Sequence, residues 1–207
     1  AGKTESAKML MRYICWRAAP QGKKPLSSSS SSSSSGLNDR IVQSNPILEA
    51  LGNAKTQRNH NSSRFGKYIR IVFKEDGDTH LAHSAYIDTY LLEKSRLVFQ
   101  TKGERNFHLF YEMLGGGTEA QRDQWQILAP GDCHYLNQSG VLSVREHDDV
   151  SEFNELCVAL NTMGMGVDVQ GQMLELMAGL LHLGNVSFGE LDEATSAQPK
   201  KARGGLG

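Results

Sequence analysis

A polar run at residues 58–67 limits the possible fold of this chain more than any other segment, because it contains hydroxyls, amides and cations and a single phenylalanine. Such groups are costly to bury without partners, so the run is unsuited to a hydrophobic core. The start of the chain gives a second signal, since Gly2, Lys3 and Thr4 complete the phosphate-binding pattern G-x-x-x-x-G-K-[ST]. The first glycine of that pattern would precede Ala1. Together the two segments predict a site for a phosphate group and a metal ion.

At both segments the sequence resembles the motor domain of myosins, in which the P-loop ends in AGKTES and the loop called switch I reads N-x-N-S-S-R-F-G-K. Kinesins share only the S-S-R core, and the residues that follow it here, Phe65, Gly66 and Lys67, favour myosins. Further segments resemble a myosin head in the same order and extend the resemblance over residues 1 to about 188. They are residues 45–56, 90–96, 103–111, 134–139 and 182–186. They do not assign a myosin class.

The resemblance implies an α/β fold: the core of a P-loop NTPase motor with a mixed central β-sheet and surrounding helices, here partial and truncated at both ends. It also implies that residues 1–207 belong to one motor domain, because a whole myosin head is several times longer. The implied parts are the P-loop end and its helix (1–19), a serine-rich loop 1 (20–36), helices and switch I (37–67), transducer strands and the following segment (68–100), and incomplete helices of the upper actin-binding subdomain (101–207).

Local patterns predict the elements within these parts. A tract of serines at residues 27–35 favours a flexible surface loop, with an engineered or sequencing-derived linker as the alternative. Pro46 predicts the start of a short helix over residues 47–54. The remaining predictions are strands at 68–73 and 81–87 around a turn at 75–78, and helices at 4–19, 107–114, 119–128, 151–163 and 170–183.

The resemblance assigns the P-loop residues their roles. Lys3 would lie over the β- and γ-phosphates, and Thr4 would give its hydroxyl to Mg²⁺. Backbone N–H groups at the start of the following helix would hold the phosphates. The full nucleotide-binding set is Ala1, Gly2, Lys3, Thr4, Glu5, Asn59, Ser62 and Ser63. Without the second segment, the same start would be an ordinary helix beginning with an exposed lysine.

Within switch I the resemblance assigns Ser63 as the second hydroxyl on Mg²⁺ and Ser62 as a group near the attacking water. Asn59 would donate to a phosphate. Arg64 would pair with a glutamate of a switch II motif, D-I-x-G-F-E, which residues 1–207 do not contain. The implied catalytic residues are therefore Ser62, Arg64 and Asn59, and His60 has no assigned role. Apart from the resemblance, the run could be an exposed turn.

The function implied is that of an actin-based motor that binds ATP and Mg²⁺ and hydrolyses ATP to move along actin filaments. The ATPase would be actin-activated in the intact protein, and the 207-residue chain alone would be inactive. Light chains or calmodulin would bind a neck outside this sequence. Two alternatives remain: a myosin-like actin-binding scaffold without turnover, and a kinesin-like microtubule motor. Tail, cargo, direction of movement and oligomeric state lie outside these residues.

Composition narrows the remaining classes. The formal net charge of −1 argues against a nucleic-acid partner, and the basic group of Lys200, Lys201 and Arg203 is explained by a solvated loop. The three cysteines lack C-x-x-C spacing, so neither a disulfide framework nor a zinc knuckle is predicted. With no signal peptide and no apolar run of about 18 residues, we expect a cytoplasmic, cytoskeleton-associated protein without a membrane span.

The positions of the histidines in the sequence suggest no metal site. His80 and His83 would point to opposite faces of a strand, because side chains alternate along it. His108, His134 and His182 fall in segments that pack, where a hydrogen-bonded structural histidine is the common case.

Overall fold

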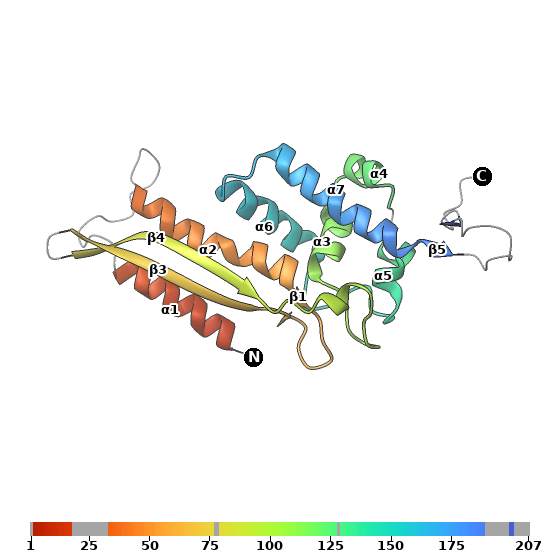
Figure 1. Cartoon of the computed structure of the whole chain (residues 1–207), viewed down its shortest axis with the longest axis horizontal. Coiled ribbons are helices and arrows are strands. Elements are labelled where there is room, and N and C mark those ends of the chain that lie inside the picture. Colours follow the sequence, from red (N-terminus) through yellow and green to blue (C-terminus); the bar gives the residue numbers. More distant parts are fainter. Residues whose placement is uncertain (1, 18–32, 77–78, 128, 189–198, 201–207) are drawn as a thin grey trace.

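The computed structural model describes residues 2–17, 33–76, 79–127, 129–188 and 199–200. Figure 1 shows a long two-stranded ribbon with two helices at one side of the molecule and a body of further helices at the other. The helices are α1 (Lys3–Arg17), α2 (Ser33–Gly52), α3 (His108–Gly116), α4 (Glu119–Trp125), α5 (His134–Asn137), α6 (Asp149–Thr162) and α7 (Val167–Gly184), with 3-10 helices η1 (Lys94–Leu97) and η2 (Pro130–Asp132). The strands are β1 (Asn53–Ala54), β2 (Ser62–Ser63), β3 (Gly66–Asp76), β4 (Thr79–Tyr90), β5 (Ser187–Phe188) and β6 (Pro199–Lys200).

Helix α1 begins directly after Gly2, as the phosphate-binding pattern predicts. Gly2 has a φ of 107°, which suits glycine because it lacks a Cβ. Its carbonyl accepts a hydrogen bond from the Ser6 N–H at 2.8 Å, which closes the first turn. The predicted helix over residues 4–19 is confirmed as far as Arg17, and the last two positions lie outside the described residues.

Helix α2 runs unbroken through Pro46, which corrects the prediction of a separate short helix starting there. Proline lacks the N–H that would bond the carbonyl of Val42, four residues earlier. The side chain of Asn45 replaces that donor, because its Nδ2 donates to the Val42 carbonyl at 3.1 Å. The helix then ends at Gly52, so Ala54 belongs to a strand instead.

The start of α2 corrects the predicted end of the serine-rich loop. The helix begins at Ser33, so the last serines and Gly36 are helical. Serine ranks only modestly below the better helix formers, and a helix nucleated farther along can extend back through it. The prediction of a flexible loop at residues 20–32 falls on residues that the structure does not describe.

The ribbon is an antiparallel pair of long strands, β3 and β4. Its register pairs Gly66 with Tyr90 at one end, and it shifts between Val72 and Phe73. The strands predicted at 68–73 and 81–87 are confirmed, and both are longer than predicted. The predicted turn at 75–78 is corrected at residues 75–76, which belong to β3, and residues 77–78 lie outside the described part of the chain.

The predicted mixed central sheet is not formed by the strands that the structure describes, although the α/β character is confirmed. These strands pair as β1 with β2, β3 with β4 and β5 with β6, and each pair is antiparallel. A parallel neighbour requires a crossover of a dozen or more residues, whereas β3 and β4 follow one another as a hairpin. The described segments therefore contribute a ribbon rather than a whole sheet.

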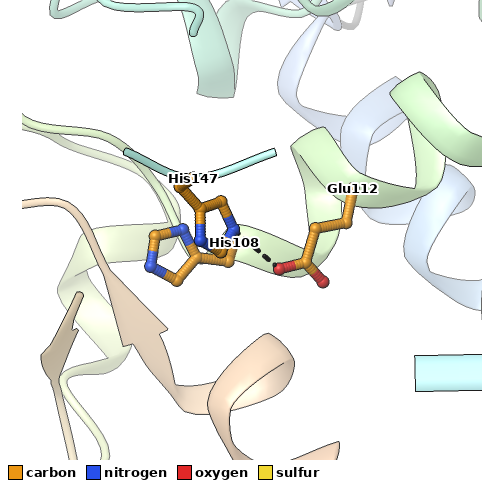
Figure 2. Close-up of side chains that lie close together, drawn as sticks. All are labelled: His108, Glu112 and His147. Atoms are coloured by element: carbon orange, nitrogen blue, oxygen red, sulfur yellow. Dashed lines mark hydrogen bonds and ion pairs between the residues drawn. The ribbon is translucent and has the colours of Figure 1, made fainter. Parts of the chain in front are cut away.

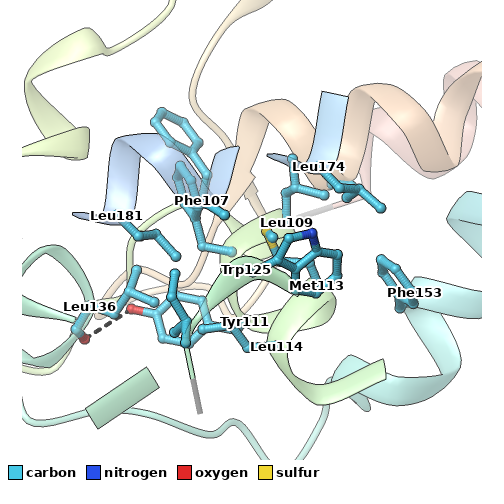
Figure 3. Close-up of a cluster of buried hydrophobic side chains, with 14 of the residues drawn as sticks. Phe107, Leu109, Tyr111, Met113, Leu114, Trp125, Leu136, Phe153, Leu174 and Leu181 are labelled. Atoms are coloured by element: carbon cyan, nitrogen blue, oxygen red, sulfur yellow. Dashed lines mark hydrogen bonds between the residues drawn. The ribbon is translucent and has the colours of Figure 1, made fainter. Parts of the chain in front are cut away.

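The helical body packs around α3, in which every residue from His108 to Leu114 is buried. Figure 3 shows the neighbouring helices converging on it. Burying each large apolar side chain contributes about 1.5–3 kcal/mol, so this cluster is the main source of stability in the body. The contributors outside α3 include Trp125, Leu136, Phe153, Leu156, Leu160, Leu174, Ala178 and Leu181.

The helices predicted for the body are present with shifted bounds: α4 ends at Trp125, short of the predicted range 119–128, and α5 was not predicted. Asp148, rather than Ser151, caps α6, since its carboxylate accepts a hydrogen bond from the Val150 N–H at 3.2 Å. Helix α7 begins at Val167, three residues before the predicted Gln170, and ends at Gly184 as predicted.

Helix α2 connects the ribbon with the helical body. Near its middle, Ile41 packs with Met11 of α1 against the ribbon residues Ile69, Ile71 and Ala85. Near its end, Ala50 belongs to the apolar cluster around α3. The hairpin that carries the polar run follows directly after this end.

Candidate functional site

The polar run lies on a short hairpin formed by β1 and β2. Its register pairs Asn53 with Ser63, and the second strand consists of Ser62 and Ser63. The Arg64 N–H extends the pairing by donating to the Gly52 carbonyl at 2.8 Å. Both serines are therefore held on extended backbone at the end of α2, rather than in a loose turn.

A second set of contacts fixes the hairpin to the segment before α3. Ala54 forms an antiparallel bridge with Phe107. The Arg105 N–H donates to the Lys55 carbonyl at 3.0 Å, and Lys55 Nζ donates to the Gly103 carbonyl at 2.6 Å. Strand β1, with which the serines pair, is thus held on both edges.

Phe65 packs back over the end of α2, and a glycine makes the room. A Cβ on Gly52 would lie 2.4 Å from the Phe65 ring. In the same way, a Cβ on Gly66 would lie 2.4 Å from the Tyr90 ring of the opposite strand. The Phe-Gly pair after the serines therefore sets the entry into the ribbon, which explains its place in the motif.

Asn59 is engaged within the hairpin loop. Its side-chain oxygen accepts a hydrogen bond from the Asn61 N–H, and its Nδ2 donates to the Asn61 carbonyl, both at 3.0 Å. The Asn59 carbonyl accepts from the Thr56 N–H at 2.8 Å. An amide nitrogen carries two hydrogens, so Asn59 keeps donor capacity for a further acceptor.

The two serines differ in their contacts. The Ser63 hydroxyl donates to the Phe65 carbonyl at 2.9 Å, and its side chain is exposed. Because that bond uses the hydrogen, the lone pairs of Ser63 Oγ are available to a hard cation such as Mg²⁺. Ser62 Oγ accepts a hydrogen bond from Arg64 NH1 at 3.1 Å. The residues present thus fit the magnesium ligand role predicted for Ser63.

Arg64 has an anionic partner that the sequence analysis missed. Its Nε donates to Glu93 Oε2 at 2.6 Å, and the Glu93 N–H donates to the Arg64 carbonyl at 2.9 Å. The sequence resemblance assigned Arg64 only a switch II glutamate outside residues 1–207 and did not predict the contact with Glu93. The hairpin register contained the signal, because pairing Gly66 with Tyr90 brings the residues just after Tyr90 opposite those just before Gly66.

Glu93 is shared between two guanidinium groups. Arg96 Nε donates to the same carboxylate oxygen at 2.8 Å, and Arg96 NH1 donates to Glu104 Oε2 at 2.9 Å. Arg96 NH1 also donates to the Arg105 carbonyl at 3.1 Å. The resulting network joins Arg64 of the polar run to η1 and to the segment before α3.

The network fixes the charge of its carboxylate. Burial alone would raise the pKa of Glu93, but hydrogen bonds from Arg96 and Arg64 outweigh burial and hold this pKa below its ordinary value of 4.5. Burial likewise opposes the charge on Arg96, and its bonds to Glu93 and Glu104 raise its pKa in spite of that. Glu93 is therefore ionised throughout the neutral range.

A family model described as "Myosin head (motor domain)" matches residues 1–204. The chain belongs to the myosin head family. It is 46% identical over 197 residues to "Myosin heavy chain IB" of Acanthamoeba castellanii, covering 95% of this chain and 16% of that protein. It is 44% identical over 203 residues to "Myosin ID heavy chain" of Dictyostelium discoideum, covering 97% and 17%. "Myosin-14" of Arabidopsis thaliana is 40% identical over 203 residues, covering 97% of the chain and 12% of that protein.

This myosin head sequence therefore spans less than a fifth of the length of these heavy chains. Of its helices that the structure describes, none combines the length and apolar character needed to cross a membrane. The predicted P-loop residues fall at the margin of the described part: Ala1 lies outside it, as do the side chains of Lys3, Thr4 and Glu5. Figure 1 places the N-terminal end of α1 toward the same end of the ribbon as β1.

Proposed function

We propose that this chain is part of an actin-based motor that binds ATP with Mg²⁺ and hydrolyses it to drive movement along actin filaments. The observation that carries the proposal is the anchored serine hairpin followed by the ion-paired Arg64, in a member of the myosin head family. The protein would work in the cytoplasm on the cytoskeleton, with light chains or calmodulin on a neck outside this sequence.

At the phosphates we propose roles for both segments. Lys3 compensates charge on the β- and γ-phosphates, and N–H groups from Ala1 to Glu5 donate to phosphate oxygens at the start of α1. Thr4 and Ser63 give hydroxyl oxygens to Mg²⁺, which supplies charge compensation when bound. The exposed Ser63 hydroxyl supports this assignment, because its hydrogen is donated to the Phe65 carbonyl and its lone pairs are available.

At the γ-phosphate we propose that Ser62 orients the attacking water, Asn59 donates to a phosphate oxygen, and Arg64 links the loop to a switch II glutamate elsewhere in the protein. That arrangement requires Arg64 to leave Glu93. Arg96 bonds the same Glu93 carboxylate, so the carboxylate would stay paired after Arg64 leaves. The ion pair seen here would then belong to a state in which hydrolysis does not proceed.

The five-part layout given by the resemblance is part of the proposal: P-loop end, loop 1, switch I, transducer strands and upper actin-binding helices. Large exposed apolar side chains support it, because they occur on α1 and on the ribbon, where further strands of a larger sheet would cover them. These side chains are Met9, Leu10, Tyr68, Val72, Phe73 and Tyr86. The 207-residue chain alone would be inactive as an ATPase, since it contains no switch II motif.

The test compares two variants of the whole protein. Lys3→Ala should weaken ATP binding about tenfold to a hundredfold, the loss expected when a charged hydrogen-bond partner is removed. Arg64→Ala should leave ATP binding intact and abolish the rapid burst of phosphate, because its role comes after binding. Lys74→Ala, an exposed lysine on β3, is the matched control.

Stopped-flow binding of a fluorescent ATP analogue and quenched-flow phosphate release separate the two steps, and co-sedimentation with actin filaments tests the partner. A normal burst in Arg64→Ala would reject its proposed role. Unchanged ATP affinity in Lys3→Ala would reject the phosphate site. Binding to actin filaments without ATP turnover would favour a scaffold over a motor.

A further inference from the structure

A second polar group lies away from the switch I hairpin, at the start of α3. His108 and Glu112 are four residues apart and therefore share one face of that helix. His147 comes from the segment before α6, where it bridges to Val144. Figure 2 shows the three side chains converging from these two segments.

The three side chains are almost completely enclosed. His108 is 1% exposed and Glu112 is 2% exposed, and the His147 side chain is 8% exposed. His147 Nε2 lies 3.0 Å from Glu112 Oε1, and the His147 ring stacks on the His108 ring with 4.0 Å between centroids. One ligand atom from each residue can be chosen so that all lie within 4.8 Å of one another.

Several polar atoms of this group have no hydrogen-bond partner in the described structure. They are both ring nitrogens of His108 and Glu112 Oε2. This corrects the expectation of a hydrogen-bonded His108, whereas His182 meets it by bonding the Trp125 carbonyl at 2.7 Å. Buried polar atoms without a hydrogen-bond partner destabilise the folded state, so a further binding partner for this group would be favourable.

A proton alone does not meet that need. A protonated His147 pairs with Glu112 Oε1, but neither nitrogen of His108 gains a bond from it. A metal ion instead accepts one lone pair from each of the three side chains, and so it would engage His108 as well. This difference separates a metal site from a simple ion pair.

The net charge of the three-residue group itself also favours a cation. Arg105 is fully buried nearby, and its NH2 lies 2.7 Å from Asp149 Oδ1, so these two charges compensate each other. The guanidinium also lies over the Tyr111 ring, 3.7 Å from its centroid. With both imidazoles neutral, Glu112 leaves the three-residue group with one negative charge.

We propose that His108, Glu112 and His147 bind a divalent transition-metal ion, with zinc as the best fit. Two imidazoles and one carboxylate are ligands that zinc prefers, and a histidine and a second ligand four residues apart on a helix suit one ion. Zinc binds such ligands at about 2.0–2.2 Å, so the atoms must move closer by about an ångström. Mg²⁺ is disfavoured because it prefers oxygen ligands. The ion would tie α3 to the segment before α6.

The test uses the whole protein, nucleotide-free, stripped with a chelator and then dialysed against zinc with excess Mg²⁺. Bound zinc is measured by atomic emission, and cobalt substitution reports the ligand field by visible absorption. The variants are Glu112→Gln, which removes the charge at nearly constant shape, and His147→Gln, which lies outside the helix. His134→Gln, an exposed histidine on α5, and Cys157→Ser, which removes a thiol, are the controls.

We expect the wild type and both controls to bind one more zinc ion per chain than the two variants, with zinc affinity at the site reduced by more than about tenfold in the variants. Zinc should raise the melting temperature of the wild type and controls only. If the wild type binds no zinc, or if all five proteins bind it equally, the proposal is wrong. The wild-type measurement decides the matter even if a variant fails to fold.

Discussion

Arg64 and Glu93 are joined twice, by the side-chain ion pair at 2.6 Å and by the hydrogen bond from the Glu93 N–H to the Arg64 carbonyl at 2.9 Å. The two residues are far apart in sequence, on opposite sides of the ribbon hairpin. The double contact therefore closes the base of the ribbon and sets the position of the serine hairpin that precedes it.

Replacing Glu93 with Gln should destabilise the protein by about 1–3 kcal/mol, because Arg64 loses its carboxylate and the buried Arg96 keeps Glu104 as its one remaining anionic partner among the described residues. Urea denaturation measures the free energy of unfolding. Glu155→Gln, at an exposed position on α6, is the control and should change stability by less than about 0.5 kcal/mol. Equal losses in the two variants would show that the ion-pair network contributes little.

The contribution of Glu93 should disappear in acid. Its pKa in the folded protein is below the ordinary 4.5, so its ionised form stabilises the fold above that pH, and the benefit is lost as the pH falls through the folded value. The stability difference between wild type and Glu93→Gln should therefore be largest near neutral pH and shrink below about pH 4.5. Urea titrations over a pH series test this. A stability difference that grows on acidification would contradict this prediction. Burial also raises the pKa of Glu112, but that effect is the same in both proteins and cancels in the difference between them.

Asn45→Ala should cost about 1–3 kcal/mol, because the Val42 carbonyl would lose the donor that replaces the missing N–H of Pro46. In a Pro46→Ala background the backbone supplies that donor again, so the same substitution should cost less by about 1 kcal/mol. A double-mutant cycle in urea measures the coupling. Zero coupling would mean that Asn45 acts mainly through its other bond, the one that its Oδ1 accepts from Lys67 Nζ at 2.8 Å.

Gly52→Ala should destabilise by about 1–3 kcal/mol, since the new Cβ would lie 2.4 Å from the Phe65 ring. Removing the ring in Phe65→Ala should make the glycine substitution nearly neutral. Thermal unfolding of the four proteins of this cycle tests the contact. Gly179→Ala serves as control, because a Cβ at that helical position meets no atom within 4 Å and should be neutral or stabilising. A large loss from Gly52→Ala that persists without the ring would point to the backbone instead.

Sequence patterns predicted the existence of most elements because those patterns are local. The long strands of the ribbon and the helices of the body follow from alternation and three- to four-residue spacing. The failure at Pro46 has a specific cause: one neighbouring side chain supplies a single hydrogen bond, which general proline statistics do not capture.

At the candidate site, too, local patterns predicted some residues and missed those brought together by the fold. The motif identified the polar run, and the structure places Ser62 and Ser63 on an anchored strand. Glu93 was missed because its partner lies across a hairpin, so that only the register of the strands brings the two together. The group at His108 was missed for a related reason, since His147 reaches α3 from a distant segment and no local spacing reveals the convergence.

Helix α2 has a mechanical consequence. Its 20 residues make a rod about 30 Å long, held by Ile41 in one apolar cluster and by Ala50 in the other. Ile41 lies near the middle of this rod and Ala50 near its end, about 14 Å apart along the axis, so the rod cannot tilt at one of these points without affecting the other. Any twisting of the ribbon must therefore reappear as a displacement of the helical body, and the serine hairpin attached to the rod's far end must move with it.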